Sequence, residues 1–94
     1  MFNISGTITL GGTAQVADIA RPLRKGYMIQ NHSAGDLWIN DMTTAVASQP
    51  SIRIPAGALY ETPNSGDLGG GAYGTGALSI IGATTGQAFS GRSW

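Results

Sequence analysis

Hydrophobic and polar residues alternate along positions 2–10, with apolar side chains at Phe2, Ile4, Ile8 and Leu10. A period of two places successive side chains on opposite faces of an extended strand, so that one face is buried and the other meets solvent. Two glycines follow and favour a turn. The pattern predicts one strand over residues 2–10, with its apolar side chains facing the core.

The segment from residue 26 to residue 40 has the clearest strand pattern in the chain. Residues 26–31 and 36–40 each alternate apolar and polar positions, and a short glycine-containing loop, 32–35, lies between them. A loop of this length commonly joins two antiparallel strands. We therefore predict a β-hairpin, with Trp38 on the face opposite its apolar neighbours. The side chains expected to face the core are Tyr27, Ile29, Leu37 and Ile39.

Further short apolar runs continue the pattern to the end of the chain. Residues 14–19 fit a weak strand or a single helical turn, and residues 42–49 fit a loop or a helical turn. About seven or eight strands, with turn residues roughly every 8–12 positions, are typical of antiparallel sandwiches and small barrels. The sequence therefore predicts an all-β fold, either a small antiparallel β-sandwich or a barrel, as one domain over residues 1–94. The remaining strands are expected at 50–54, 58–62, 77–82 and 87–90.

Residues 64–76 are low in complexity and contain six glycines. A segment with little apolar surface and high chain entropy is expected to be a mobile loop that becomes ordered against a partner. Residues 69–74 match the pattern G-x-G-x-x-G. They neither follow a predicted strand nor open a helix, so they do not predict a dinucleotide site.

Length and composition limit how such a domain can be stabilised. A chain of 94 residues buries only about 60–65% of its unfolded surface. It has no cysteine and a single histidine, His32, so disulfides, thiolate metal sites and histidine clusters are excluded. Small domains without disulfides or bound metal ions commonly gain stability from partners. We therefore expect a homo-oligomer or docking onto a larger structure, with His32 as an exposed loop residue.

Charge excludes other function classes. Five basic residues balance five acidic ones, whereas nucleic-acid binders normally show a basic excess. Arg21, Arg24 and Lys25 form one basic cluster, which fits either a docking patch for an acidic surface or phosphate, or a solvated loop. The first residues lack the features of a signal peptide, and no run approaches the roughly 20 apolar residues of a membrane helix. We expect synthesis in the cytosol, no membrane partner and no nucleic-acid partner.

Catalytic constellations are also missing from the sequence. His32 could pair with an aspartate, but no serine lies in a nucleophile-elbow context, and the five acidic residues are scattered without an apolar pocket that would raise a pKa. The sequence predicts no enzyme activity, no cofactor and no small-molecule substrate.

Aromatic and outward-facing arginine residues are the candidates for contact with a partner. Trp38 fits either a second packed layer or an exposed contact. Trp94 cannot easily reach the core, so either another chain holds it or it folds back onto its own sheet edge. The candidate interface comprises Trp38, Arg53, Tyr60, Tyr73, Arg92 and Trp94.

Three blocks of the chain resemble small virion proteins of tailed bacteriophages. They are residues 24–40, with the cadence Gln-Asn, loop, Leu-Trp-Ile-Asn; residues 52–57, with Ile-Pro-Ala-Gly; and residues 78–90, with Ser-Ile-Ile-Gly-Ala-Thr-Thr-Gly-Gln. The resemblance implies a jelly-roll-like sandwich that decorates or cements a capsid, or an accessory of the head–tail region or fibre base. It implies localisation in the virion after synthesis in the bacterial cytoplasm, with the major capsid protein and further copies of the chain as partners.

A carbohydrate-binding module is the alternative from another functional class. Its stacking platforms would be Trp38, Tyr60 or Tyr73. A nucleic-acid-binding barrel is a more distant alternative, which salt-sensitive binding to oligonucleotides would reveal.

Overall fold

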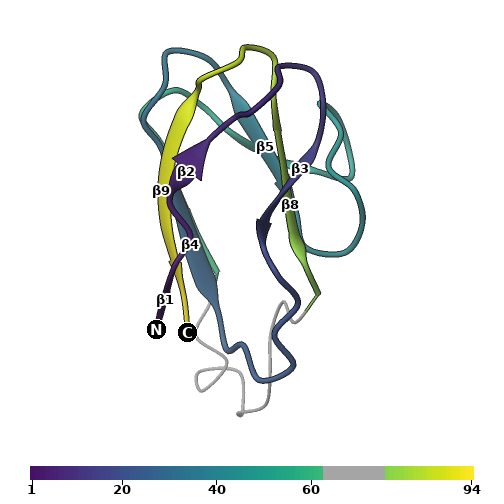
Figure 1. Cartoon of the computed structure of the whole chain (residues 1–94), viewed down its shortest axis with the longest axis vertical. Coiled ribbons are helices and arrows are strands. Elements are labelled where there is room, and N and C mark those ends of the chain that lie inside the picture. Colours follow the sequence, from purple (N-terminus) through teal and green to yellow (C-terminus); the bar gives the residue numbers. More distant parts are fainter. Residues whose placement is uncertain (63–75) are drawn as a thin grey trace.

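The computed structural model describes residues 1–62 and 76–94, which form nine strands in two antiparallel sheets (Figure 1). The predicted all-β sandwich is confirmed. Of the predicted mobile loop 64–76, only Gly76 lies within the described residues, and Tyr73 lies outside them. The first sheet contains β1 (Phe2–Asn3), β2 (Gly6–Thr7), β9 (Ala88–Ser93), β4 (Tyr27–Asn31) and β7 (Leu59–Glu61). The second contains β3 (Gln15–Asp18), β8 (Leu78–Gly82), β5 (Leu37–Asn40) and β6 (Ile52–Ile54).

The strand pairing is that of one long hairpin rolled into two layers. β2 pairs with β9, β3 with β8, β4 with β7, and β5 with β6, so that the pairs are nested along the chain. Rolling adds the pairs β4–β9 and β5–β8, which complete the two sheets. This is the strand order of a jelly roll. The jelly-roll-like form of the predicted sandwich is therefore present.

The predicted hairpin over residues 26–40 is wrong. β4 lies in the first sheet and β5 in the second, so the two strands face each other across the core and do not pair. The buried Asn31 side chain holds the corner between them: its Nδ2 donates to the carbonyl oxygens of Gly35 (2.7 Å) and Ile54 (2.8 Å). Its Oδ1 accepts from the backbone N–H of Ser33 (2.8 Å). These bonds direct the chain across to the other sheet.

The predicted strand over residues 2–10 is interrupted. Ile4 and Ile8 are buried as predicted, but Phe2 and Leu10 are exposed. β1 pairs with the end of β9 and β2 with its start. Phe2 therefore lies beside the end of β9, at Ser93, whereas Leu10 follows β2, which pairs with the start of β9. Residues 15–18 form a strand, so the helical-turn alternative for this segment is excluded.

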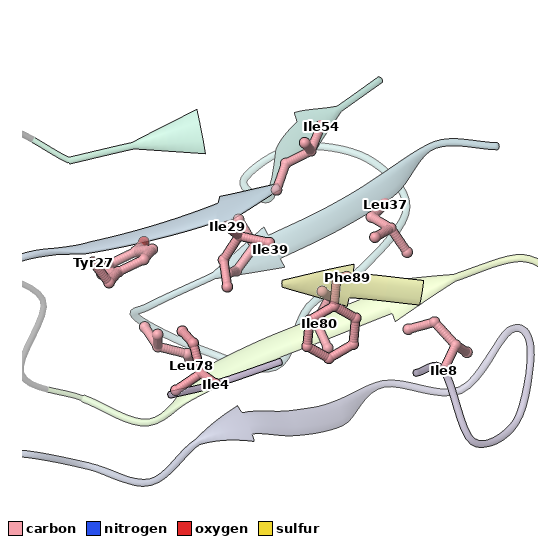
Figure 2. Packing of buried hydrophobic residues seen from close by; sticks show 10 residues of the cluster. All are labelled: Ile4, Ile8, Tyr27, Ile29, Leu37, Ile39, Ile54, Leu78, Ile80 and Phe89. Atoms are coloured by element: carbon pink, nitrogen blue, oxygen red, sulfur yellow. The ribbon is translucent and has the colours of Figure 1, made fainter. Parts of the chain in front are cut away.

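Ten buried side chains form the core, and both sheets contribute to it (Figure 2). The four core residues predicted for segment 26–40 are among them and are fully buried. Each fully buried aliphatic or aromatic side chain contributes about 1.5–3 kcal/mol, so this cluster is the main source of stability. The cluster consists of Ile4, Ile8, Tyr27, Ile29, Leu37, Ile39, Ile54, Leu78, Ile80 and Phe89.

Both chain ends lie at the same end of the sandwich as the connection from β3 to β4 (Figure 1). We call this the terminal end. In the part of the chain described, no helix is long and apolar enough to cross a membrane.

Candidate functional site: a groove at the terminal end

An apolar groove of about 410 Å³ opens at the terminal end. It lies between the first residue of β1, the connection from β3 to β4, and the residue that follows β9. Phe2 is 48% exposed and Leu23 is 85% exposed, so large apolar surfaces here meet solvent. We call this surface the terminal groove, and its lining consists of Phe2, Ala20, Arg21, Pro22, Leu23, Arg24 and Trp94.

A buried carboxylate organises the connection that forms one wall of the groove. β3 ends, after a register shift, at Asp18, whose side chain is almost fully buried. Asp18 accepts hydrogen bonds from Nε of Arg21 (2.9 Å), from Nη2 of Arg24 (2.7 Å) and from Oγ of Ser93 (3.0 Å). The connection therefore wraps around Asp18 and is tied to β9.

Arg24 is a structural residue. Its side chain is fully buried, and besides Asp18 it donates to the carbonyl oxygens of Gly76 (2.7 Å, from Nη1) and Ile19 (2.7 Å, from Nη2). A solvated loop, one of the two interpretations of the basic cluster, is thus wrong for this residue. Arg21 remains partly exposed and Lys25 is exposed, so these two provide the accessible positive charge of the cluster.

The pKa of Asp18 lies below its ordinary value. Burial acts to raise this pKa, but hydrogen bonds from Arg21, Arg24 and Ser93 and the charge of Arg21 lower it, and their combined effect is larger. The carboxylate is therefore ionised in the folded protein at neutral pH, as its ion pairs require.

Acid is expected to destabilise the fold through Asp18. Because the folded-state pKa is below the unfolded value of 3.8, the unfolded chain binds the proton more readily, and acid favours unfolding. The contribution of Asp18 is fully present above the unfolded pKa and is lost as pH falls through the folded pKa. The melting temperature, measured between about pH 6 and pH 2, should fall at the acidic end, and it should fall less steeply for the Asp18→Asn variant. Equal slopes for the two proteins would contradict this role.

Aromatic side chains complete the groove. The guanidinium carbon of Arg21 lies 3.6 Å from the centre of the Phe2 ring, a cation–π contact. Trp94 continues β9, since its N–H donates to the carbonyl of Gly26 (3.0 Å) and its own carbonyl accepts from the N–H of Gly26 (3.2 Å). The indole lies so close to Gly26 that an added Cβ would be 2.9 Å from Cζ2. Trp94 therefore extends β9 beside β4 in the middle of the first sheet, and its indole contacts Gly26 of its own chain. It is held by its own chain, but not at a sheet edge as the second alternative from the sequence had it.

The other predicted interface residues lie elsewhere. Trp38 and Arg53 are cross-strand neighbours on the outer face of the second sheet, and Nε of Arg53 is 3.8 Å from Oδ2 of Asp36. Trp38 is half-buried and lines a second hollow of about 390 Å³, the Trp38 hollow. Besides Trp38, this hollow is lined by Gly12, Asp36, Ala47, Ile81, Gly82 and Ala83. Arg92, in contrast, is exposed on the outer face of the first sheet.

Tyr60 faces the other way. It is half-buried, packs against the core, and its ring lies 5.9 Å from that of Tyr27. The predicted interface residues within 1–62 and 76–94 thus occupy several surfaces, and of these residues only Trp94 lines the terminal groove. Phe2 and Leu23 were not predicted as contact residues. For Leu23 the sequence held a signal: it is a leucine next to a proline within a basic cluster, where no apolar residue nearby in the sequence would bury it.

Comparison with known protein families, characterised proteins and solved structures finds no match to this chain. Within residues 1–62 and 76–94, no group of three or more His, Asp or Glu side chains could hold a metal ion.

Proposed function

We propose that the chain is a non-enzymatic structural protein of a phage virion, which binds and stabilises the capsid as a decoration or cement protein. The terminal groove is the observation that carries this proposal. Exposed apolar surface with a polar rim is characteristic of protein–protein interaction sites. The resemblance of residues 24–40, 52–57 and 78–90 to phage virion proteins supports the virion context, and jelly rolls occur in viral capsid proteins.

The groove has the properties of a preformed docking surface. Its wall is held by the ion pairs of Asp18 with Arg21 and Arg24 and by the pairing of Trp94 with Gly26. A rigid surface loses little conformational entropy when a partner binds, so more of the contact energy appears as affinity. Binding of the folded form alone also raises the stability of a small domain by mass action.

The proposal predicts that the protein travels with the particle and stabilises it. Particles of the phage that encodes the chain should contain many copies, and capsids assembled without the chain should melt at a lower temperature, because bound ligand stabilises the folded assembly. Differential scanning calorimetry of both kinds of capsid, with quantitative gel analysis, measures this. Capsids that lack the protein and melt unchanged would overturn the proposal. A few copies per particle would indicate a head–tail or tail accessory protein.

A carbohydrate-binding module is the second candidate, and the Trp38 hollow favours it. Tryptophan faces can stack on sugar rings, lectins also use jelly rolls, and Asp36 in the same hollow could accept hydrogen bonds from hydroxyl groups. A glycan array with the wild type and with Trp38→Ala separates the two proposals. We expect no glycan to bind. Binding that Trp38→Ala abolishes would establish the module.

A further inference from the structure

We propose that the terminal groove of one copy binds the outer face of strand β7 of a second copy, so that the chain associates head to side. This inference rests on the proposed function: among copies bound to the capsid, the groove of one copy holds β7 of its neighbour, and this lateral contact strengthens the binding of both copies to the capsid.

The charges around the groove indicate an acidic partner. Segment 18–25 contains three basic side chains, Arg21, Arg24 and Lys25, and one acidic side chain, Asp18. Arg24 and Asp18 form a buried pair, so the accessible charge is positive. The whole chain carries no net charge, so the rest of it carries a matching negative excess. A groove that is apolar inside and positive at its rim fits a segment with a large apolar side chain next to a carboxylate.

Strand β7 offers this pair of groups on the same molecule. It is an edge strand of the first sheet, and Leu59 and Glu61 are exposed while Tyr60 between them packs against the core. Leu59 is 53% exposed. None of the ion pairs formed within residues 1–62 and 76–94 uses Glu61. An apolar and an acidic side chain thus point to the same side of an accessible strand.

The apolar and acidic groups of β7 match the apolar and basic groups of the groove. Side chains at positions i and i+2 of a strand lie about 7 Å apart on one face. In the groove, the Arg21 guanidinium carbon lies 3.6 Å from the centre of the Phe2 ring, and Leu23 is part of the same lining. Lys25 follows Leu23 by two positions along the chain and is exposed. Leu59 of one copy inserted against Phe2 and Leu23 of another would bring Glu61 within reach of Arg21 or Lys25.

The contact joins two different surfaces, so it is heterologous. Such contacts either close into rings or form open chains that keep one groove and one β7 free at their ends. This geometry suits a protein that is arranged in many copies on a larger surface.

Two exposed substitutions test the contact. Leu23→Gln removes the apolar group from the groove, and Glu61→Lys reverses the charge on β7; neither residue belongs to the core. Sedimentation equilibrium should show concentration-dependent association of the wild type and an at least about tenfold weaker association of each variant, as for residues central to an interface. An equimolar mixture of the two variants should form a 1:1 dimer, because one intact groove then meets one intact β7. High salt should weaken association of the wild type.

Met42→Gln is the matched control, because Met42 is 79% exposed, lies outside the groove and β7, and should associate like the wild type. Circular dichroism spectra and thermal unfolding curves of each variant test whether it is folded. Wild type that stays monomeric to about 1 mM, or folded variants whose mixture stays monomeric, would overturn the inference. A chain that binds capsids but never self-associates overturns the head-to-side contact alone. A chain that self-associates but does not bind capsids overturns the proposed function and leaves the contact in place.

Discussion

Replacing Arg24 with methionine is expected to lower the free energy of unfolding by about 3–5 kcal/mol, because the change leaves the buried Asp18 carboxylate without its buried partner. It also removes the donors to the carbonyl oxygens of Gly76 and Ile19. A small domain has a total stability of roughly 5–15 kcal/mol, so the variant is expected to be close to unfolding at room temperature.

Arg21→Met is the control for this substitution. Arg21 binds the same carboxylate but is partly exposed, so its loss should cost about 1 kcal/mol. Urea unfolding followed by tryptophan fluorescence measures both variants. Equal losses for Arg21→Met and Arg24→Met would show that burial of Arg24 does not govern the stability of the cluster, and would contradict the assigned structural role.

Gly91→Ala is expected to cost about 3 kcal/mol through overpacking. Gly91 pairs with Ile29 on the neighbouring strand β4, and an added Cβ would lie 2.6 Å from the carbonyl oxygen of Met28 and 2.7 Å from Cγ1 of Ile4. Because one of these neighbours is backbone, the methyl group can be accommodated only by moving the β4–β9 pair. That pair joins the two middle strands of the first sheet.

Gly6→Ala is the matched control in the same sheet. Its Cβ would meet a ring atom of Phe89 at 3.3 Å, which a small movement of the ring relieves, so its cost should stay below about 1 kcal/mol. Urea unfolding of both variants measures the difference. A loss for Gly91→Ala no larger than that for Gly6→Ala would mean that the first sheet adjusts more easily than the close contacts indicate.

The alternation of apolar residues predicted which side chains form the core, but not which strands pair. Tyr27 and Leu37 were predicted to face the core, and both are fully buried. A period of two identifies the face of a strand that is buried, and it is the same whether the next strand lies beside it or across the core. The choice depends on Asn31, whose side chain bonds to the carbonyl of Ile54 far along the chain.

The site was predictable only in part, for a related reason. The basic cluster and Trp94 were both identified as candidates, and the structure brings them together at the terminal end. The residue that organises the cluster is Asp18, whose hydroxyl partner Ser93 is 75 positions away. Trp38 and Arg53 also become neighbours only through the pairing of β5 with β6. Local sequence patterns do not show which residues far apart in the chain come together in the fold.

Co-sedimentation of the purified protein with capsids of the tailed phage that we propose encodes it tests the central claim most directly. Wild type and Met42→Gln should appear in the particle fraction in many copies per capsid, and Leu23→Gln should bind at least about tenfold more weakly, since it removes an exposed leucine from the terminal groove. Wild type that stays in the supernatant, or Leu23→Gln that binds as well as wild type, would contradict the account of the terminal groove as the docking surface of a virion protein.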